Sequence, residues 1–166
     1  MSEAQGTQAG DGQSAATADS KVFDLQKIYI KDMSFENPNA PQIFTIPWQP
    51  RVGQHLSSRR EQLGDGVYEV ILSVTLTVSL GERTAYLVEV HQAGIFRISG
   101  YPAAQLDALL GSYCLKILHP YIREAISDLI AKGGYPQFLL PPIDFDGLYA
   151  DYQRQRAASQ PAAASA

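Results

Sequence analysis

The sequence predicts an α+β fold, in which a four-stranded antiparallel sheet carries helices packed on one face. Two observations predict it. Apolar and polar residues alternate along several segments before Gly100, and beyond that point the apolar residues recur at helical spacing instead. Strands that come first and helices that follow are typical of folds that gather their helices on one side of a sheet.

The clearest strand signal is VYEVILSVTLTVSL at 67–80, where every even position is apolar and most odd positions are polar. A period of two over that length predicts a long strand with one buried face. A turn at 81–82 leads into 84–98, which continues the alternation, so these two segments are expected to form a hairpin. Weaker alternation predicts two further strands at 51–59 and 25–36.

Helical spacing predicts a short helix at 103–111 and a longer amphipathic helix at 113–132. Pro120 is expected to bend the longer helix or to mark its true start, because proline removes a backbone donor inside a helix. The glycine pair at 133–134 is expected to end it. Asp144 is a suitable N-cap for a last helix, whose apolar residues follow helical spacing.

Composition excludes several classes of protein. The chain has 166 residues, of which 45% are hydrophobic, and 13 Lys+Arg against 17 Asp+Glu give a net charge of −4. This balance argues against a nucleic-acid binder and against a basic membrane-surface protein. A single cysteine, Cys114, cannot form a disulfide within the chain. With no long apolar run and no signal-peptide pattern, we expect a cytoplasmic protein without direct membrane insertion.

The two ends of the chain differ in composition from the middle. Residues 1–21 are mostly Ala, Gly, Ser, Gln and Thr, and residues 157–166 have a similar bias. Such segments bury too little apolar surface to offset the entropy of ordering, so both are expected to be disordered. The folded domain is therefore expected to span 22–156.

A long connection, FENPNAPQIFTIPWQP at 35–50, separates the first two predicted strands and holds the only tryptophan, Trp48. It is too apolar for a disordered linker, and long irregular connections in compact domains are often functional. It either covers the core or forms the wall of an apolar binding groove, and the residues alone leave both interpretations open.

No motif predicts catalysis or a cofactor. The phosphate-binding glycine motifs, the zinc-ligand spacings and the nucleophile-elbow motif are absent from the sequence. Cys114 is interpreted as a packed thiol, Asp144 and Asp146 as helix-capping carboxylates, and His91 as a solvated side chain. We expect no catalytic, cofactor-binding or metal-binding residues, and no enzyme.

The polar face of the sheet has an unusual composition. Leu87 precedes Glu89 on the odd, polar side of its strand, and Asp32, Ser34 and Glu36 share one face of the first strand. Residues two apart on a strand are about 6.6–6.8 Å apart, so these side chains are expected to form a small acidic area that contains an exposed leucine. The simplest interpretation is a solvated face, and the alternative is a docking surface.

Four stretches carry a resemblance to a known family: FDLQKIYIKDMSFENPNAP, WQP, YEVILSVTLTVSLGERTAYLVEVHQAGIF and LHPYIREAISDLIAKGGYPQFLLPPIDFDGLY. They resemble the SecB family of bacterial protein-export chaperones over about residues 23–152. The resemblance implies a cytoplasmic chaperone that holds unfolded precursor proteins, keeps them competent for translocation and delivers them to the SecA ATPase. It also implies a homotetramer built as a dimer of dimers, with no cofactor.

The resemblance implies two sets of site residues. The SecA-binding positions of the family fall on Asp32, Glu36, Leu87 and Glu89, which are the residues singled out by strand alternation. The client-binding positions fall on Phe44, Trp48 and Tyr149. Tails in the family are often acidic and make a second SecA contact, whereas residues 153–166 here carry two arginines and no carboxylate.

Three alternatives remain at this point. SecB-like chaperones that belong to toxin–antitoxin systems share the fold. A small α+β enzyme such as a hot-dog thioesterase is a second alternative, and a carrier of a small ligand is a third. The proline-rich apolar connection and the absence of catalytic motifs favour the export chaperone.

Overall fold

A computed structural model describes residues 20–159. The segments predicted to be disordered fall largely outside this range, at 1–19 and 160–166. The four strands are β1 (Val22–Glu36), β2 (Arg51–Gly64), β3 (Val67–Leu80) and β4 (Arg83–Ser99). The helical elements are η1 (Gln42–Thr45), α1 (Ala103–Ala108), the π-helical turn η2 (Leu109–Tyr113), α2 (Cys114–Lys132) and α3 (Phe145–Ser159).

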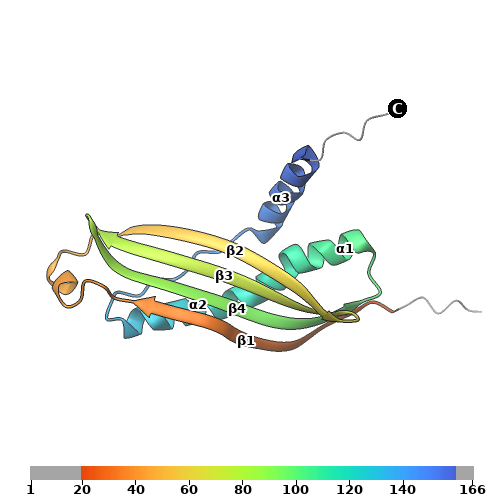
Figure 1. The fold of residues 1–166 in the computed structure, drawn as a ribbon, viewed down its shortest axis with the longest axis horizontal. Helices are drawn as coiled ribbons and strands as arrows, with labels where there is room; N and C mark the ends of the chain where they lie inside the picture. The colour runs from red at the N-terminus through yellow and green to blue at the C-terminus, as the bar shows by residue number, and fades with distance from the viewer. Residues whose placement is uncertain (1–19, 160–166) are drawn as a thin grey trace, which may run out of the picture.

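The strands form one antiparallel sheet in the order β1-β4-β3-β2 (Figure 1). The hairpin predicted from the alternation at 67–80 and 84–98 is present as β3–β4, and it lies at the centre of the sheet. β1 and β2 follow one another in sequence but lie at opposite edges, so the connection at 37–50 has to pass across the end of the sheet. The α+β class and the antiparallel sheet are confirmed.

α2 packs on one side of the sheet and runs behind the strands in Figure 1, whereas α3 packs against η2 and projects away from the sheet. The chain stays helical from α1 through η2 into α2, where the sequence predicts two separate helices. Pro120 lies inside α2 and does not mark its start. None of the helices that the structure describes is long and apolar enough to cross a membrane.

The core lies between α2 and the even-numbered face of β3 and β4. Leu72, Val74 and Val90 are fully buried there against Leu118 and Ile122 of α2. Gly94 allows the helix to come this close to β4. A Cβ at that position would lie 2.7 Å from the Phe96 ring and 3.0 Å from a methyl group of Leu118.

We therefore predict that Gly94→Ala lowers the free energy of unfolding by about 1–3 kcal/mol, as overpacking of a closed core does. Gly53→Ala is the matched control, because a Cβ at this strand glycine comes no nearer than 3.6 Å to the Thr77 backbone oxygen. Urea unfolding of both variants at one protein concentration measures the difference. Equal stability of the two variants would show that Gly94 does not set the distance between helix and sheet.

Candidate functional site

The face of the sheet that points away from α2 brings the predicted docking residues together. Glu36 pairs with Leu87 and Ser34 pairs with Glu89 in the register of β1 against β4. Asp32 pairs with His91 in the next row on the same face. The four residues Asp32, Glu36, Leu87 and Glu89 thus occupy neighbouring positions on two adjacent strands, and we call this area the acidic face.

A β-bulge at Lys31 gives β1 this orientation. Ile30 pairs with Gln92 and Asp32 with His91, so that one extra residue sits between two successive pairs. Without the bulge, Asp32 would share a face with Ile30, because residues two apart on a regular strand lie on the same side. The bulge therefore turns the acidic end of β1 outward.

Glu89 is held in place by its neighbours. The His91 Nε2–H donates to Glu89 Oε1 at 2.6 Å, and the Thr75 hydroxyl donates to Oε2 at 3.2 Å. These bonds, first that of His91 and then that of Thr75, hold the pKa of Glu89 below its usual range. Ser73 Oγ lies 2.7 Å from His91 Nδ1. His91, which is interpreted from the sequence as solvated, is therefore a hydrogen-bond partner of Glu89.

A buried carboxylate lies further along the same side of the sheet. Glu69 is only 4% exposed and accepts hydrogen bonds from Lys31 Nζ at 2.7 Å and from the Tyr29 hydroxyl. The bond from Lys31, followed by that from Tyr29, lowers the pKa of Glu69. Burial and the Glu69 charge raise the pKa of Tyr29 to about 12. The alternation predicts a solvated position for Glu69, but partners on β1 cover it.

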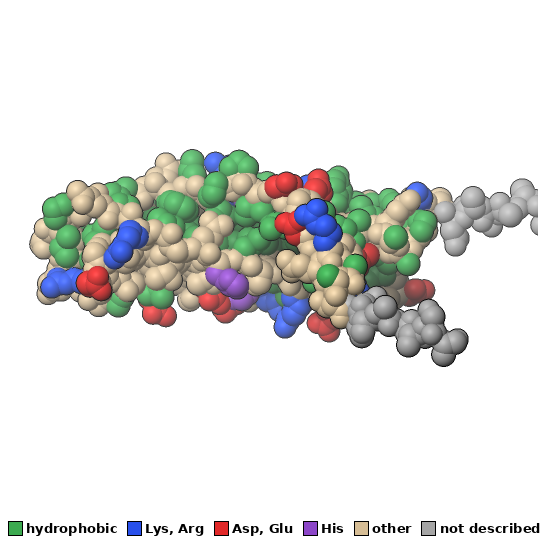
Figure 2. All heavy atoms as spheres, turned by 90° about the horizontal axis from the view of Figure 1, so that it is seen from above, with side chains coloured by type: hydrophobic (Ala, Val, Ile, Leu, Met, Phe, Trp, Pro, Cys, Tyr) green, Lys and Arg blue, Asp and Glu red, His purple; other side chains and the backbone are tan. Residues whose placement is uncertain are grey.

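A cavity of about 620 Å³ opens between the β2 edge of the sheet, the η2 turn and α3. Its lining is mainly apolar near the helices and includes Leu56, Leu110, Ile143, Phe145, Leu148, Tyr149 and Tyr152. Figure 2, seen from above Figure 1, looks onto the side from which α3 projects and shows hydrophobic side chains spread between charged ones. Such a cavity can take apolar side chains of an extended chain.

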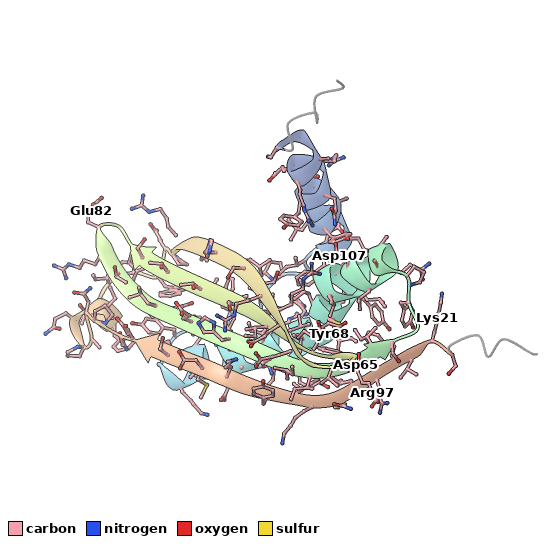
Figure 3. The ribbon with its side chains drawn as sticks, turned by 45° about the vertical axis from the view of Figure 1, so that its right-hand side comes forward. Lys21, Asp65, Tyr68, Glu82, Arg97 and Asp107 are labelled. Carbon is pink, nitrogen blue, oxygen red and sulfur yellow. The ribbon has the colours of Figure 1, made fainter. Side chains whose placement is uncertain are left out.

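Asp107 joins three elements beside this cavity. Its carboxylate accepts hydrogen bonds from the Tyr149 hydroxyl at 2.5 Å and from Gln153 Nε2 at 2.7 Å, both on α3, and from Arg60 of β2. Figure 3 shows Asp107 where α1 meets the base of α3. The bonds from Tyr149 and Arg60 hold the pKa of Asp107 below its usual range. Sequence reasoning missed this group, because its members are far apart along the chain.

The aromatic residues of the connection lie elsewhere. Phe44 and Trp48 both pack against Tyr135. Their ring centroids lie 5.1 Å and 5.6 Å, respectively, from the centroid of the Tyr135 ring. They are 50% and 38% exposed, whereas Ile43 beside them is 1% exposed. The connection therefore both covers the core and presents aromatic surface. The structure brings Phe44 and Trp48 together but keeps them apart from the cavity that Tyr149 lines.

Within residues 20–159 no cluster of three or more His, Cys, Asp or Glu side chains is arranged to hold a metal ion. Cys114 is buried, and burial raises the pKa of its thiol to about 12, as expected of a packed thiol. Asp144 Oδ1 accepts the backbone N–H of Gly147 at 3.0 Å, which is the predicted N-cap bond of α3.

Comparison with known proteins gives consistent matches. The family model "Preprotein translocase subunit SecB" matches residues 16–156. A protein of Methylococcus capsulatus named protein-export protein SecB is 56% identical over 143 residues, which cover 86% of this chain and 92% of that protein. A protein of the same name from Nitrosococcus oceani is 52% identical over 136 residues, which cover 81% of this chain and 83% of that protein.

A solved structure resembles the fold at low sequence identity. It is a Mycobacterium tuberculosis SecB-like chaperone in complex with a ChAD peptide from the HigA1 antitoxin. The TM-score is 0.62 at 16% identity, and the match covers 74% of this chain and 91% of that chain. At this identity the likeness concerns the fold alone.

We predict that Asp107→Ala loosens α3, because the variant removes the acceptor shared by Tyr149, Gln153 and Arg60. We expect the free energy of local opening of α3 to fall by about 1–2 kcal/mol. If amide hydrogen exchange follows local opening, exchange in the middle of α3 should then be roughly 5–30-fold faster. Asp151→Ala is the control, because Asp151 pairs with Arg154 on the same helix. Unchanged exchange in the Asp107 variant would mean that the carboxylate does not hold α3.

Proposed function

The chain belongs to the SecB family of protein-export chaperones, and from that premise we propose which of its surfaces perform each task. It is a Sec-pathway export chaperone that binds unfolded precursor proteins, and it is not an enzyme. The thioesterase, the small-ligand carrier and the toxin–antitoxin chaperone are not favoured. We propose that it works in the cytoplasm and delivers its precursors to SecA.

The proposed SecA-binding site is the acidic face. The observation that carries this proposal is the register that gathers Asp32, Glu36, Leu87 and Glu89 on the side of the sheet that α2 leaves uncovered. Carboxylates there steer a basic partner and fix its orientation. Leu87 is half-buried within this polar face and can bury further apolar area against a partner.

Unfolded precursors are proposed to bind on two apolar areas. One is the aromatic pair Phe44 and Trp48 on the connection between β1 and β2, and the other is the cavity beside Tyr149. Aromatic and aliphatic walls can accept many sequences, because burial of apolar area does not depend on hydrogen-bond readout. Two separate areas also allow one extended chain to make contact at both.

A homotetramer, arranged as a dimer of dimers, is proposed from the apolar surface that a single chain leaves open. Leu25, Ile30 and Met33 on the edge strand β1 are exposed. Tyr113 and Tyr121, on the helical run, are exposed as well. An unpaired edge strand and exposed bulky side chains are features that a symmetric oligomer covers.

Trp48→Ala is expected to weaken precursor binding by about 1–3 kcal/mol, the range of a buried interface anchor. The fold should be retained, because Trp48 lies at the surface of the connection. Trp48→Phe, which keeps an aromatic wall, serves as the matched variant and should restore most of the affinity. Fluorescence titration with an unfolded precursor measures all three proteins. Wild-type affinity in a folded Trp48→Ala protein would reject this role for the connection.

Glu89→Lys is expected to weaken SecA binding by roughly tenfold, or about 1.4 kcal/mol. The variant replaces a carboxylate that attracts a basic partner with an ammonium group that repels it. Leu87→Gln should weaken the same contact with less dependence on salt, since it removes burial and no charge. Calorimetric titration with SecA or its isolated zinc domain at two salt concentrations separates the two effects.

Glu82→Lys is the control for these variants. It makes the same charge change at the tip of the β3–β4 turn, at one end of the molecule in Figure 3. Its SecA affinity should stay near that of the wild type. If Glu89→Lys and Leu87→Gln both bind like the wild type, SecA does not dock on this face.

A further inference from the structure

A chain of hydrogen bonds crosses the acidic face from β3 to β4. Ser73 Oγ lies 2.7 Å from His91 Nδ1, and His91 Nε2 lies 2.6 Å from Glu89 Oε1. Both nitrogens of the imidazole ring are therefore engaged. The ring is partly exposed, as is the Glu89 carboxylate, so both remain within reach of a partner and of solvent protons.

The chemistry of the three groups defines which atoms carry hydrogen. An ionised carboxylate only accepts, so Nε2 carries the proton that bonds Glu89. In a neutral ring Nδ1 then accepts from the Ser73 hydroxyl. When the ring gains a second proton, Nδ1–H donates and the Ser73 hydroxyl turns to accept. His91 can thus change its charge while every hydrogen bond in the chain is kept.

Charges from all the neighbouring strands surround this ring. Asp32 of β1 lies opposite His91 in the register, and Glu89 lies two residues before it on β4. Lys31 and Arg59 line the same shallow hollow, together with Ser57, Ser58, Ile71 and Ser73. Lys31 is itself paired with Glu69. The ring therefore lies among charges of both signs.

We propose that His91 is a positioning residue of the SecA-binding surface, one that presents the Glu89 carboxylate when neutral and offsets its charge when protonated. This inference rests on the proposed docking of SecA at the acidic face. Its consequence is that a basic partner binds more tightly as pH rises through the range in which histidines lose their charge, about pH 5 to 8.

Linkage gives the proposal a second consequence. A cationic group of the partner placed at Glu89 disfavours a second positive charge on the adjacent ring. Docking therefore releases protons from His91 wherever the free chaperone is partly protonated there. Calorimetry in buffers of different ionisation enthalpy measures this release directly, and a purely structural role for His91 would not produce it.

The test compares two substitutions that fix the charge. His91→Gln stays neutral and can still bond both Ser73 and Glu89, whereas His91→Lys stays positive. At about pH 8 the wild type should bind the SecA zinc domain as tightly as His91→Gln, and about two- to fivefold more tightly than His91→Lys. At about pH 6 the affinity of the wild type for the zinc domain should fall toward that of His91→Lys. His55→Gln, on the same face without a bond to Glu89, should keep the wild-type pH profile.

The outcomes separate this inference from the proposal on which it rests. Parallel pH profiles and equal proton release for the wild type and His91→Gln overturn the role of His91, even if Glu89→Lys still weakens binding. If Glu89→Lys also has no effect, the docking site itself is wrong. A pH dependence that His91→Gln removes and His55→Gln retains supports the role of His91.

Discussion

The asymmetry of the sheet is the constraint on which the rest of this structure depends. Each long strand presents its side chains alternately to two faces, and the chain has one helical layer to cover them. The even-numbered face of β3 and β4 is closed by α2, with Leu72, Val74 and Val90 fully buried. Within residues 20–159, the opposite face has no helical layer over it. One sheet can therefore carry a core on one side and a binding surface on the other.

Local departures from regular geometry adapt this plan to binding. The bulge at Lys31 reverses the orientation of β1, so that Asp32 and Glu36 join the open face and Met33 turns to the other side. Lys31 itself reaches Glu69 and gives this buried carboxylate an opposite charge, beside the hydrogen bond that Tyr29 donates to it. At the β2 edge, Asp107 holds α3 beside the cavity. Polar contacts between elements thus position both proposed surfaces.

The sequence predicts what local periodicity determines. Alternation at 67–80 and 84–98 identifies the central hairpin, and the same alternation places Leu87 and Glu89 on the open face. It does not predict the strand order, because the connection at 37–50 carries β2 to the far edge. It also misses the partners of Glu69, which lie 38 and 40 positions away in sequence, and those of Asp107, which lie 42, 46 and 47 positions away. Such pairs form only when distant elements meet in the folded chain. The Glu89–His91 contact is not predicted either, although the two residues lie two apart on one strand face, because alternation gives the face of a side chain and not its hydrogen-bond partner.

The central claim is that one sheet separates the proposed precursor-binding areas from the proposed SecA-binding face. Calorimetric titration of the SecA zinc domain into the chaperone, first empty and then saturated with an unfolded precursor, tests it most directly. Separate surfaces predict a ternary complex, in which the zinc domain binds the loaded and the empty chaperone with closely similar affinity. Loss of zinc-domain binding in proportion to precursor occupancy would contradict the account, because it would mean that both partners compete for one surface.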